Sequence, residues 1–207
     1  MAPKAPKAPV TCNWVKSTVT DSTLSDFVKS GHLPKTKEVM SYRAPNLSEE
    51  KPQPKKGEVI VFTNHMNWSF APPGSKFFRD VLHFFDLKPQ DIGPNSVSNI
   101  CNFQVFYEVY LGEEPNIVLF REMFYLNRQN ERANGPSLEL GGILIQRRRD
   151  CHFPYAELPS HPKDWNQTWF YCQDTSSAEE NPLPGFRTLR LESNHPLLDK
   201  PTTVERL

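Results

Sequence analysis

Residues 74–126 constrain the fold of this chain more than any other segment, because they hold more than half of its phenylalanines and half of its tyrosines. Eight of the fourteen phenylalanines and three of the six tyrosines lie in this block. Aromatic side chains bury the largest apolar areas and therefore drive much of folding. The block contains no obvious catalytic set of residues. We therefore expect the block to form the buried core. It gives little direct evidence of a catalytic activity.

Apolar residues in this block recur every three or four positions, which predicts three consecutive helices. The helices are expected over residues 76–86, from 95 or 96 to about 111, and from 116 to about 126. Ser75 is the expected N-cap of the first helix, and Gly112 is the expected end of the second. Because the connections are short, the three helices are predicted to pack as one bundle.

Segments on either side of the helical block favour β structure. Strands are predicted over residues 57–62, 138–146 and 169–172 from their β-branched and aromatic content. A short helix is also predicted over residues 23–30, with Ser22 as its N-cap. The expected fold class is therefore α+β and mainly helical, with a bundle of about three to four helices, a small β-sheet and disordered or irregular termini.

Composition divides the chain into three parts. Twenty prolines against nine glycines mark linkers and turns, and the opening MAPKAPKAPV lacks the apolar stretch of a secretory signal. We expect a disordered Pro/Lys-rich tail over 1–21, a folded domain over 22–174 and a polar irregular segment over 175–207. No run approaches the roughly 20 apolar residues of a membrane span, so we expect no membrane partner. The expected location is intracellular, in the nucleus or cytoplasm.

The sequence lacks the motifs of an aspartic protease and of a reverse transcriptase. Asp174-Thr175-Ser176 has no glycine to complete an aspartic-protease loop, and no Asp-Asp pair is present to bind Mg²⁺ as in a reverse transcriptase. A transposase or integrase needs three carboxylates on a ribonuclease-H-like sheet, which a helical core does not supply. We therefore expect no catalytic residues and no enzyme activity.

The cysteines and histidines likewise indicate no metal site. Cys12, Cys101, Cys151 and Cys172 form no CxxC pair, and we expect them to be reduced structural thiols. Cys151-His152 with His161 and Cys172 does not have the spacing of a zinc knuckle. We expect no metal and no cofactor.

The strongest local signal for a partner is the basic run Arg147-Arg148-Arg149, with Lys163, Trp165 and Trp169 downstream. Basic side chains can hold a phosphate, and aromatic rings can stack on a base. The 24 basic and 24 acidic residues give no net charge, so any RNA or DNA binding must be local and weak. The alternative is a solvated strand end whose arginines pair with Asp150, Glu157 and Asp164.

Six segments occur in an order that resembles the gypsy-type transposon domain family of plants. They are LSDFVKSGHLP, EVIVF, PPGSKFFRDVLHFFDLKPQDIGPNSV, VFYEVYLGEEPNIVLFREMFYL, ELGGILIQRR and DWNQTWFYCQD, between about residues 24 and 174. The resemblance implies a mobile-element origin and a plant source. Although some descriptions of the family use the word transposase, it implies no established catalytic residues.

These observations lead to three hypotheses. The first is a non-catalytic structural or assembly module of a retrotransposon-derived protein, Gag-like in role and acting by self-association. The second is a nucleic-acid-binding accessory domain that uses Arg147, Arg148 and Arg149. The third is a degenerate recombinase or transposase.

Overall fold

The computed structural model describes residues 11–35, 40–129, 140–151, 153–154 and 163–189. The elements in these ranges are, in chain order, α1 (Asp21–Lys29), β1 (Tyr42–Arg43), β2 (Glu58–Phe62), α2 (Thr63–Met66), α3 (Lys76–Phe84), the 3₁₀ turn η1 (Pro89–Asp91), α4 (Pro94–Val105), the π-helix η2 (Phe106–Leu111), α5 (Ile117–Met123), β3 (Phe124–Arg128), β4 (Ile143–Arg147), the 3₁₀ turn η3 (Trp165–Gln167), β5 (Trp169–Gln173) and the 3₁₀ turn η4 (Ala178–Glu180). None of these helices is both long and apolar enough to cross a bilayer.

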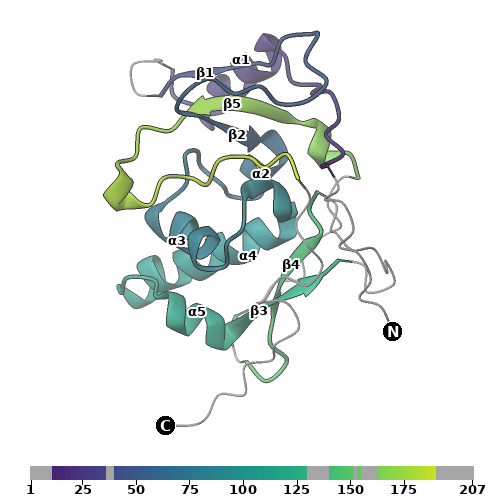
Figure 1. Cartoon of the computed structure of the whole chain (residues 1–207). Coiled ribbons are helices and arrows are strands. Elements are labelled where there is room, and N and C mark those ends of the chain that lie inside the picture. Colours follow the sequence, from purple (N-terminus) through teal and green to yellow (C-terminus); the bar gives the residue numbers. More distant parts are fainter. Residues whose placement is uncertain (1–10, 36–39, 130–139, 152, 155–162, 190–207) are drawn as a thin grey trace, which may run out of the picture.

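The strands form two separate antiparallel sheets. In the first, β5 lies between β1 and β2, with Tyr42 opposite Cys172 and Ile60 opposite Tyr171. In the second, β3 pairs only with β4. Figure 1 shows the first sheet at one end of the molecule, with α3 and α4 next to it and the β3–β4 ribbon beyond them. Helices α3 and α4 therefore lie between two small sheets.

Strands β2 and β5 are buried on both faces, and their side chains divide between two apolar clusters. Val59, Val61, Phe170 and Cys172 face the main core, where the helices pack. The alternate residues Ile60, Phe62, Trp169 and Tyr171 form a second cluster with Trp165 on the other face. This division follows from the two-residue period of a strand. Both faces of the sheet must therefore be covered.

Residues 11–20 cover the outer face of this sheet. Trp14 stacks on Phe62 with ring centroids 6.1 Å apart and meets Trp169 edge-on at the same separation. The indole of Trp169 donates a 2.8 Å hydrogen bond to the carbonyl of Val15. The sequence assigned these residues to a tail, but the structure packs them on the domain. Residues 1–10 lie outside the described ranges.

The predicted boundaries at Ser75 and Gly112 are confirmed, whereas α4 begins at Pro94 with Gly93 as its N-cap, before the predicted caps Asn95 or Ser96. The Ser75 side chain accepts a hydrogen bond from the Phe78 backbone and caps α3. Pro94 occupies the first turn of α4, where its missing N–H costs nothing. Gly112 ends η2 with a left-handed φ of 67°, a conformation that favours glycine. The predicted cap of the short first helix was wrong, because Thr20 rather than Ser22 caps α1.

The fold is α+β, but the prediction of a mainly helical bundle was wrong. The third predicted helix stops at Met123, and the chain continues directly as β3, in which Phe124 and Leu126 are buried and Tyr125 and Asn127 are partly exposed. Apolar spacing thus changes from the helical period to the strand period within one aromatic run. The second sheet that results packs against α4, so the helices pack on β structure instead of on one another alone. Residues 138–139 of the predicted strand lie outside the described ranges.

Replacing Trp14 tests whether residues 11–20 are part of the domain. We expect Trp14→Ala to lower the free energy of unfolding by about 2–3 kcal/mol, because it uncovers Phe62 and Trp169. Urea unfolding followed by circular dichroism measures this change. Val15→Ala is the matched control, since the Val15 side chain is exposed and its backbone contact is retained. Equal stability of the two variants would contradict the role given to Trp14.

Candidate functional site

The three predicted arginines lie at the end of β4, and the structure gives them different roles. Arg147 donates to the carbonyls of Cys151 and Phe153, at 3.4 and 3.2 Å, and so shapes the turn that follows the strand. Arg148 donates a 3.1 Å hydrogen bond to the carbonyl of Arg121. Arg149 is exposed, and within the described ranges it makes no hydrogen bond or ion pair. Arg149 is therefore the arginine best placed to meet a ligand.

The predicted aromatic residues do not join this basic group at an open surface. Trp165 and Trp169 are buried in the second cluster, at 4% and 0% exposure. Trp165 also fills the space beside Gly141, where a Cβ atom would approach its ring to 2.5 Å. Lys163 is exposed in the turn before η3. Neither tryptophan presents a ring face on which a base could stack.

Polar side chains of α4 bind the free edge of β4. Ser96 accepts a 2.9 Å hydrogen bond from the Ile145 backbone and donates to the Ile143 carbonyl. Asn99, three residues later on the same helix face, donates a 2.8 Å hydrogen bond to the Ile145 carbonyl. Both side chains are buried. An exposed strand edge can pair with other chains, and these contacts occupy part of it.

A pocket of about 460 Å³ lies along this junction of α4 and the β3–β4 ribbon. Its lining residues are Asn95, Ser96, Asn99, Tyr125, Leu144, Ile145, Gln146, Arg147 and Arg149. The lining includes two arginines and no carboxylate, so its charge favours an anion. Sequence reasoning found the arginines but missed Ser96 and the lining amides. The only signal for Ser96 and Asn99 was their spacing of three residues, which places both on one face of α4.

A second surface feature is an exposed apolar set at the opposite end of α4, which we call the apolar end. It consists of Val105, Val109, Tyr110, Leu111, Val118 and Leu119, all at least 42% exposed. They belong to the last residue of α4, to η2 and to the start of α5. Only residues 112–116 separate η2 from α5, so these exposed residues lie on neighbouring segments of the chain.

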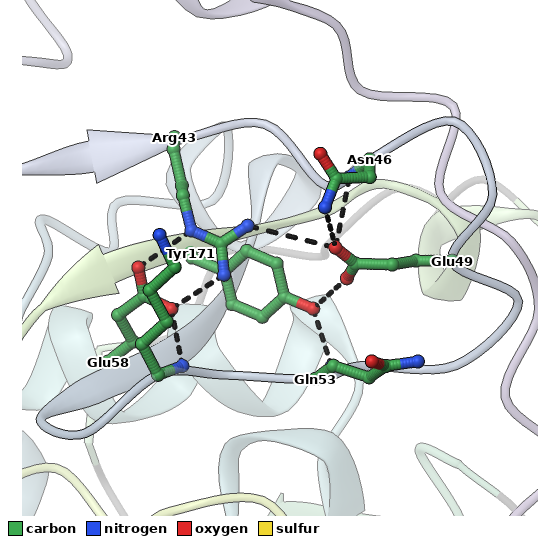
Figure 2. A network of polar contacts seen from close by, with 7 residues as sticks. Arg43, Asn46, Glu49, Gln53, Glu58 and Tyr171 are labelled. Atoms are coloured by element: carbon green, nitrogen blue, oxygen red, sulfur yellow. Dashed lines mark hydrogen bonds and ion pairs between the residues drawn. The ribbon is translucent and has the colours of Figure 1, made fainter.

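A polar network joins the loop after β1 to the central strand β5 (Figure 2). Arg43 binds both carboxylate oxygens of Glu58, at 2.7 and 2.8 Å, and its guanidinium lies 3.9 Å from the centre of the Tyr171 ring. The Tyr171 hydroxyl donates to the buried carboxylate of Glu49 and accepts a 2.6 Å hydrogen bond from the Gln53 backbone. The network therefore holds residues 43–58 against the sheet.

The electrostatics of this network favour a structural role. Burial, and then the hydrogen bond to Glu49, raise the pKa of Tyr171. Burial opposes ionisation of Glu58, but hydrogen bonds from Arg43 and from the Lys55 backbone outweigh it and hold the pKa of Glu58 below its usual range. Each charge meets a partner inside the network, and no group is left to act on a substrate. A buried, fully paired network of this kind supports one conformation.

A double-mutant cycle on Glu49 and Tyr171 tests this assignment. Tyr171→Phe removes the hydroxyl that both Glu49 and the Gln53 backbone contact, and we expect a loss of about 1–3 kcal/mol of stability. Glu49→Ala should cost a similar amount. Since the two groups contact each other, the double variant should lose less than the sum of the single losses. If urea unfolding shows that the double variant loses as much stability as the two single variants together, the contact contributes nothing to stability.

His65 is the most strongly perturbed histidine of the described residues. It is buried between Phe62 and Trp165, with ring centroids 4.9 and 5.1 Å away. Burial lowers its pKa to about 3, and a hydrogen bond with the Ile92 backbone only partly offsets this effect. Its Nε2 has no hydrogen-bond partner among the described residues. The ring is enclosed by aromatic groups and is therefore a neutral core residue.

The low pKa of His65 makes stability depend on pH in a defined direction. Below about pH 6.5 the unfolded chain binds a proton at His65 that the folded chain does not bind until about pH 3. Stability should therefore fall as the pH falls through this window, by up to about 1.4 kcal/mol per pH unit from this residue alone. His65→Phe should remove that part of the slope in urea unfolding between about pH 5 and pH 6. His32→Gln, at an exposed histidine, is the control, and an unchanged slope in His65→Phe would contradict the assignment.

The described residues contain no group of three side chains that could hold a metal ion. Cys101 and Cys172 are buried, and burial raises the pKa of each thiol to about 12. Both are therefore poor nucleophiles and poor metal ligands at neutral pH. Cys12 and Cys151 are half-buried, and their sulfur atoms accept hydrogen bonds from the Gln90 amide and the Phe153 backbone. His152 and His161, the other members of the zinc combination considered from the sequence, lie outside the described ranges.

Comparison with known proteins gives one match. Residues 59–128 match the family model described as "Putative gypsy type transposon". No curated protein and no solved structure gave a significant match. The matched segment is less than half of the 207 residues and runs from β2 to the end of β3. It contains the whole apolar end, whereas Arg147, Arg148 and Arg149 lie beyond it. The match over residues 59–128 therefore supports the resemblance to a gypsy type transposon domain that the sequence predicted.

Proposed function

We propose that this chain is a non-catalytic assembly module of a plant retrotransposon protein, and that it self-associates through the apolar end. The observation that carries the proposal is the exposure of large side chains on helices whose other faces are well buried. Val109 is 70% exposed and Tyr110 is 76% exposed. The same helical segment buries Phe103 and Tyr107 in the main core. This segment therefore carries more large apolar side chains than the core of one chain buries.

Exposure of this kind is unfavourable in water and favours a partner. Single exposed apolar residues are common, but a concentration at one end of a molecule marks an interaction site. Burying Val, Leu or Tyr side chains at an interface is favourable in proportion to the apolar area removed from water. Tyr110 combines a large apolar ring with a hydroxyl, a residue type that is enriched in interfaces. The apolar end has the composition of an interface core.

A second copy of the same chain fits this surface. The chain has 24 basic and 24 acidic residues, so two copies do not repel through net charge. A two-fold interface would place the apolar end of one copy against the apolar end of the other. The same exposed side chains of both copies would then be buried together. The apolar end also lies wholly within the segment shared with the transposon family. Self-association is therefore a property that other members of the family can share.

Two buried carboxylates, Glu49 and Asp91, support a role without catalysis, because both are engaged in the fold. Glu49 binds Tyr171 and the Asn46 amide. Burial raises the pKa of Asp91 to about 6, but its carboxylate contacts Arg187 at 3.1 Å and the Lys88 backbone at 2.7 Å. These contacts hold the end of the described chain against η1. Perturbed groups at an active site would instead converge on an open cavity.

Self-association can be tested by replacing two exposed side chains of the apolar end. We expect full-length protein to form dimers or larger assemblies in light scattering, and the double variant Val109→Lys with Tyr110→Lys to be monomeric. Lysine is a good helix former and is favoured near a helix C-terminus, so the variant should remain folded. Circular dichroism and urea unfolding check this point.

Leu47→Lys is the matched control, because Leu47 is 80% exposed but lies in the loop after β1, away from the apolar end. This variant should associate as the wild type does. A monomeric wild type at all concentrations, or a double variant that associates as strongly as the wild type, would overturn the proposal.

A further inference from the structure

The pocket between α4 and the β3–β4 ribbon combines two features that point to one kind of ligand. Its lining includes Arg149, which is exposed. It also includes Asn95, whose Oδ1 is shielded from solvent and has no hydrogen-bond partner among the described residues. A cation attracts an anion, whereas an amide oxygen without a partner needs a hydrogen-bond donor. A ligand that carries an anionic group at one position and a donor at another satisfies both requirements.

We propose that this pocket binds one nucleotide, with the phosphate at Arg149 and the base edge at the amides of Asn95 and Gln146. A nucleotide carries both an anionic phosphate and a base edge with N–H donors. The pocket volume of about 460 Å³ is within the usual range for small-molecule sites, about 300–1,000 Å³. The inference goes beyond self-association and concerns the opposite end of α4 from the apolar end.

Arg149 supplies the phosphate contact because the neighbouring arginines are already engaged. Arg147 and Arg148 donate to backbone carbonyls of the fold. The guanidinium of Arg149 retains its donors, and the planar group matches the geometry of a phosphate. Arg147 also lines the pocket, so its positive charge adds to the local field. The pocket lining has no carboxylate to cancel these charges.

Hydrogen bonds orient the Gln146 amide toward a base. Its Oε1 accepts hydrogen bonds from the Tyr125 hydroxyl at 3.0 Å and from the Asn127 amide at 3.1 Å. With the oxygen engaged twice, the amide offers its Nε2 donor to a ligand. Asn95, which also lines the pocket, has an acceptor oxygen that no described residue contacts. A donor and an acceptor on two neighbouring elements can match the edge of a base, and half-buried Tyr125 offers apolar contact beside them.

The same chemistry is present in a free nucleotide and in single-stranded nucleic acid, and the experiment separates the two. Fluorescence anisotropy would measure binding of the full-length protein to a labelled strand of about ten nucleotides containing adenine and cytosine. A strand of equal length without bases would show how much of the affinity comes from phosphate alone. AMP, CMP and inorganic phosphate would be added as competitors. The monomeric Val109→Lys, Tyr110→Lys variant should bind equally well, which keeps this test independent of assembly.

Two substitutions give distinct expected results. Arg149→Ala should weaken binding of both strands by about tenfold, because a charged hydrogen bond is lost. Asn95→Ala should weaken binding of the base-containing strand several-fold and leave the abasic strand unaffected. It should not lower the midpoint of urea unfolding, because it removes a buried acceptor without a partner. Lys16→Ala, at an exposed cation of the N-terminal segment, is the control for loss of charge.

The outcomes decide the proposal. Competition by AMP or CMP, but not by phosphate, would identify a free nucleotide as sufficient. Competition only by unlabelled strands, with the base-containing strand favoured, would identify single-stranded nucleic acid. Both results support the nucleotide assignment. Wild-type affinity in Arg149→Ala, or equal affinity for the base-containing and abasic strands, would overturn it.

Discussion

The central position of β5 is the constraint on which the rest of this structure depends. The strand pairs with β1 on one edge and β2 on the other, and alternate side chains enter two different apolar clusters. One face is covered by the helices, and the other needs the N-terminal segment that carries Trp14. A segment far away in the sequence is therefore required to cover one face of β5. The aromatic side chains of β5 make this covering favourable, since they bury large apolar areas on both faces.

The polar network around Tyr171 extends the same constraint to the loop after β1. A tyrosine in a fully buried strand must find partners for its hydroxyl, and Glu49 and the Gln53 backbone provide them. Arg43 in turn lies over the ring and pairs with Glu58 on the neighbouring segment. The network is therefore better understood as the way in which the sheet holds an irregular loop than as a catalytic group. The buried His65 is a similar case, because aromatic packing keeps it neutral.

Helix α4 connects the two surfaces to which we assign functions. Its middle is buried in the aromatic core, which leaves its ends to differ in character. At the N-terminal end, polar side chains bind β4 and line the pocket beside Arg149. At the C-terminal end, the helix widens into η2 and presents the apolar end. Assembly and nucleotide binding can therefore occur on one domain without competing for the same residues.

Local patterns in the sequence were enough to predict β2, β5 and α3 and the end of η2, because their signals lie within a few residues: a β-branched or aromatic run, an N-capping serine and a glycine with positive φ. The order of these segments also predicted the family confirmed over residues 59–128. Local pattern could not predict that β3 follows α5 without a break, because Phe124 and Leu126 fit either period until β4 pairs with them. Nor could local pattern distinguish the exposed Arg149 from Arg147 and Arg148, which bind backbone carbonyls. It also could not show that Trp165 and Trp169 are buried. Those outcomes depend on backbone carbonyls and apolar surfaces far away in the chain, which only the tertiary structure brings together.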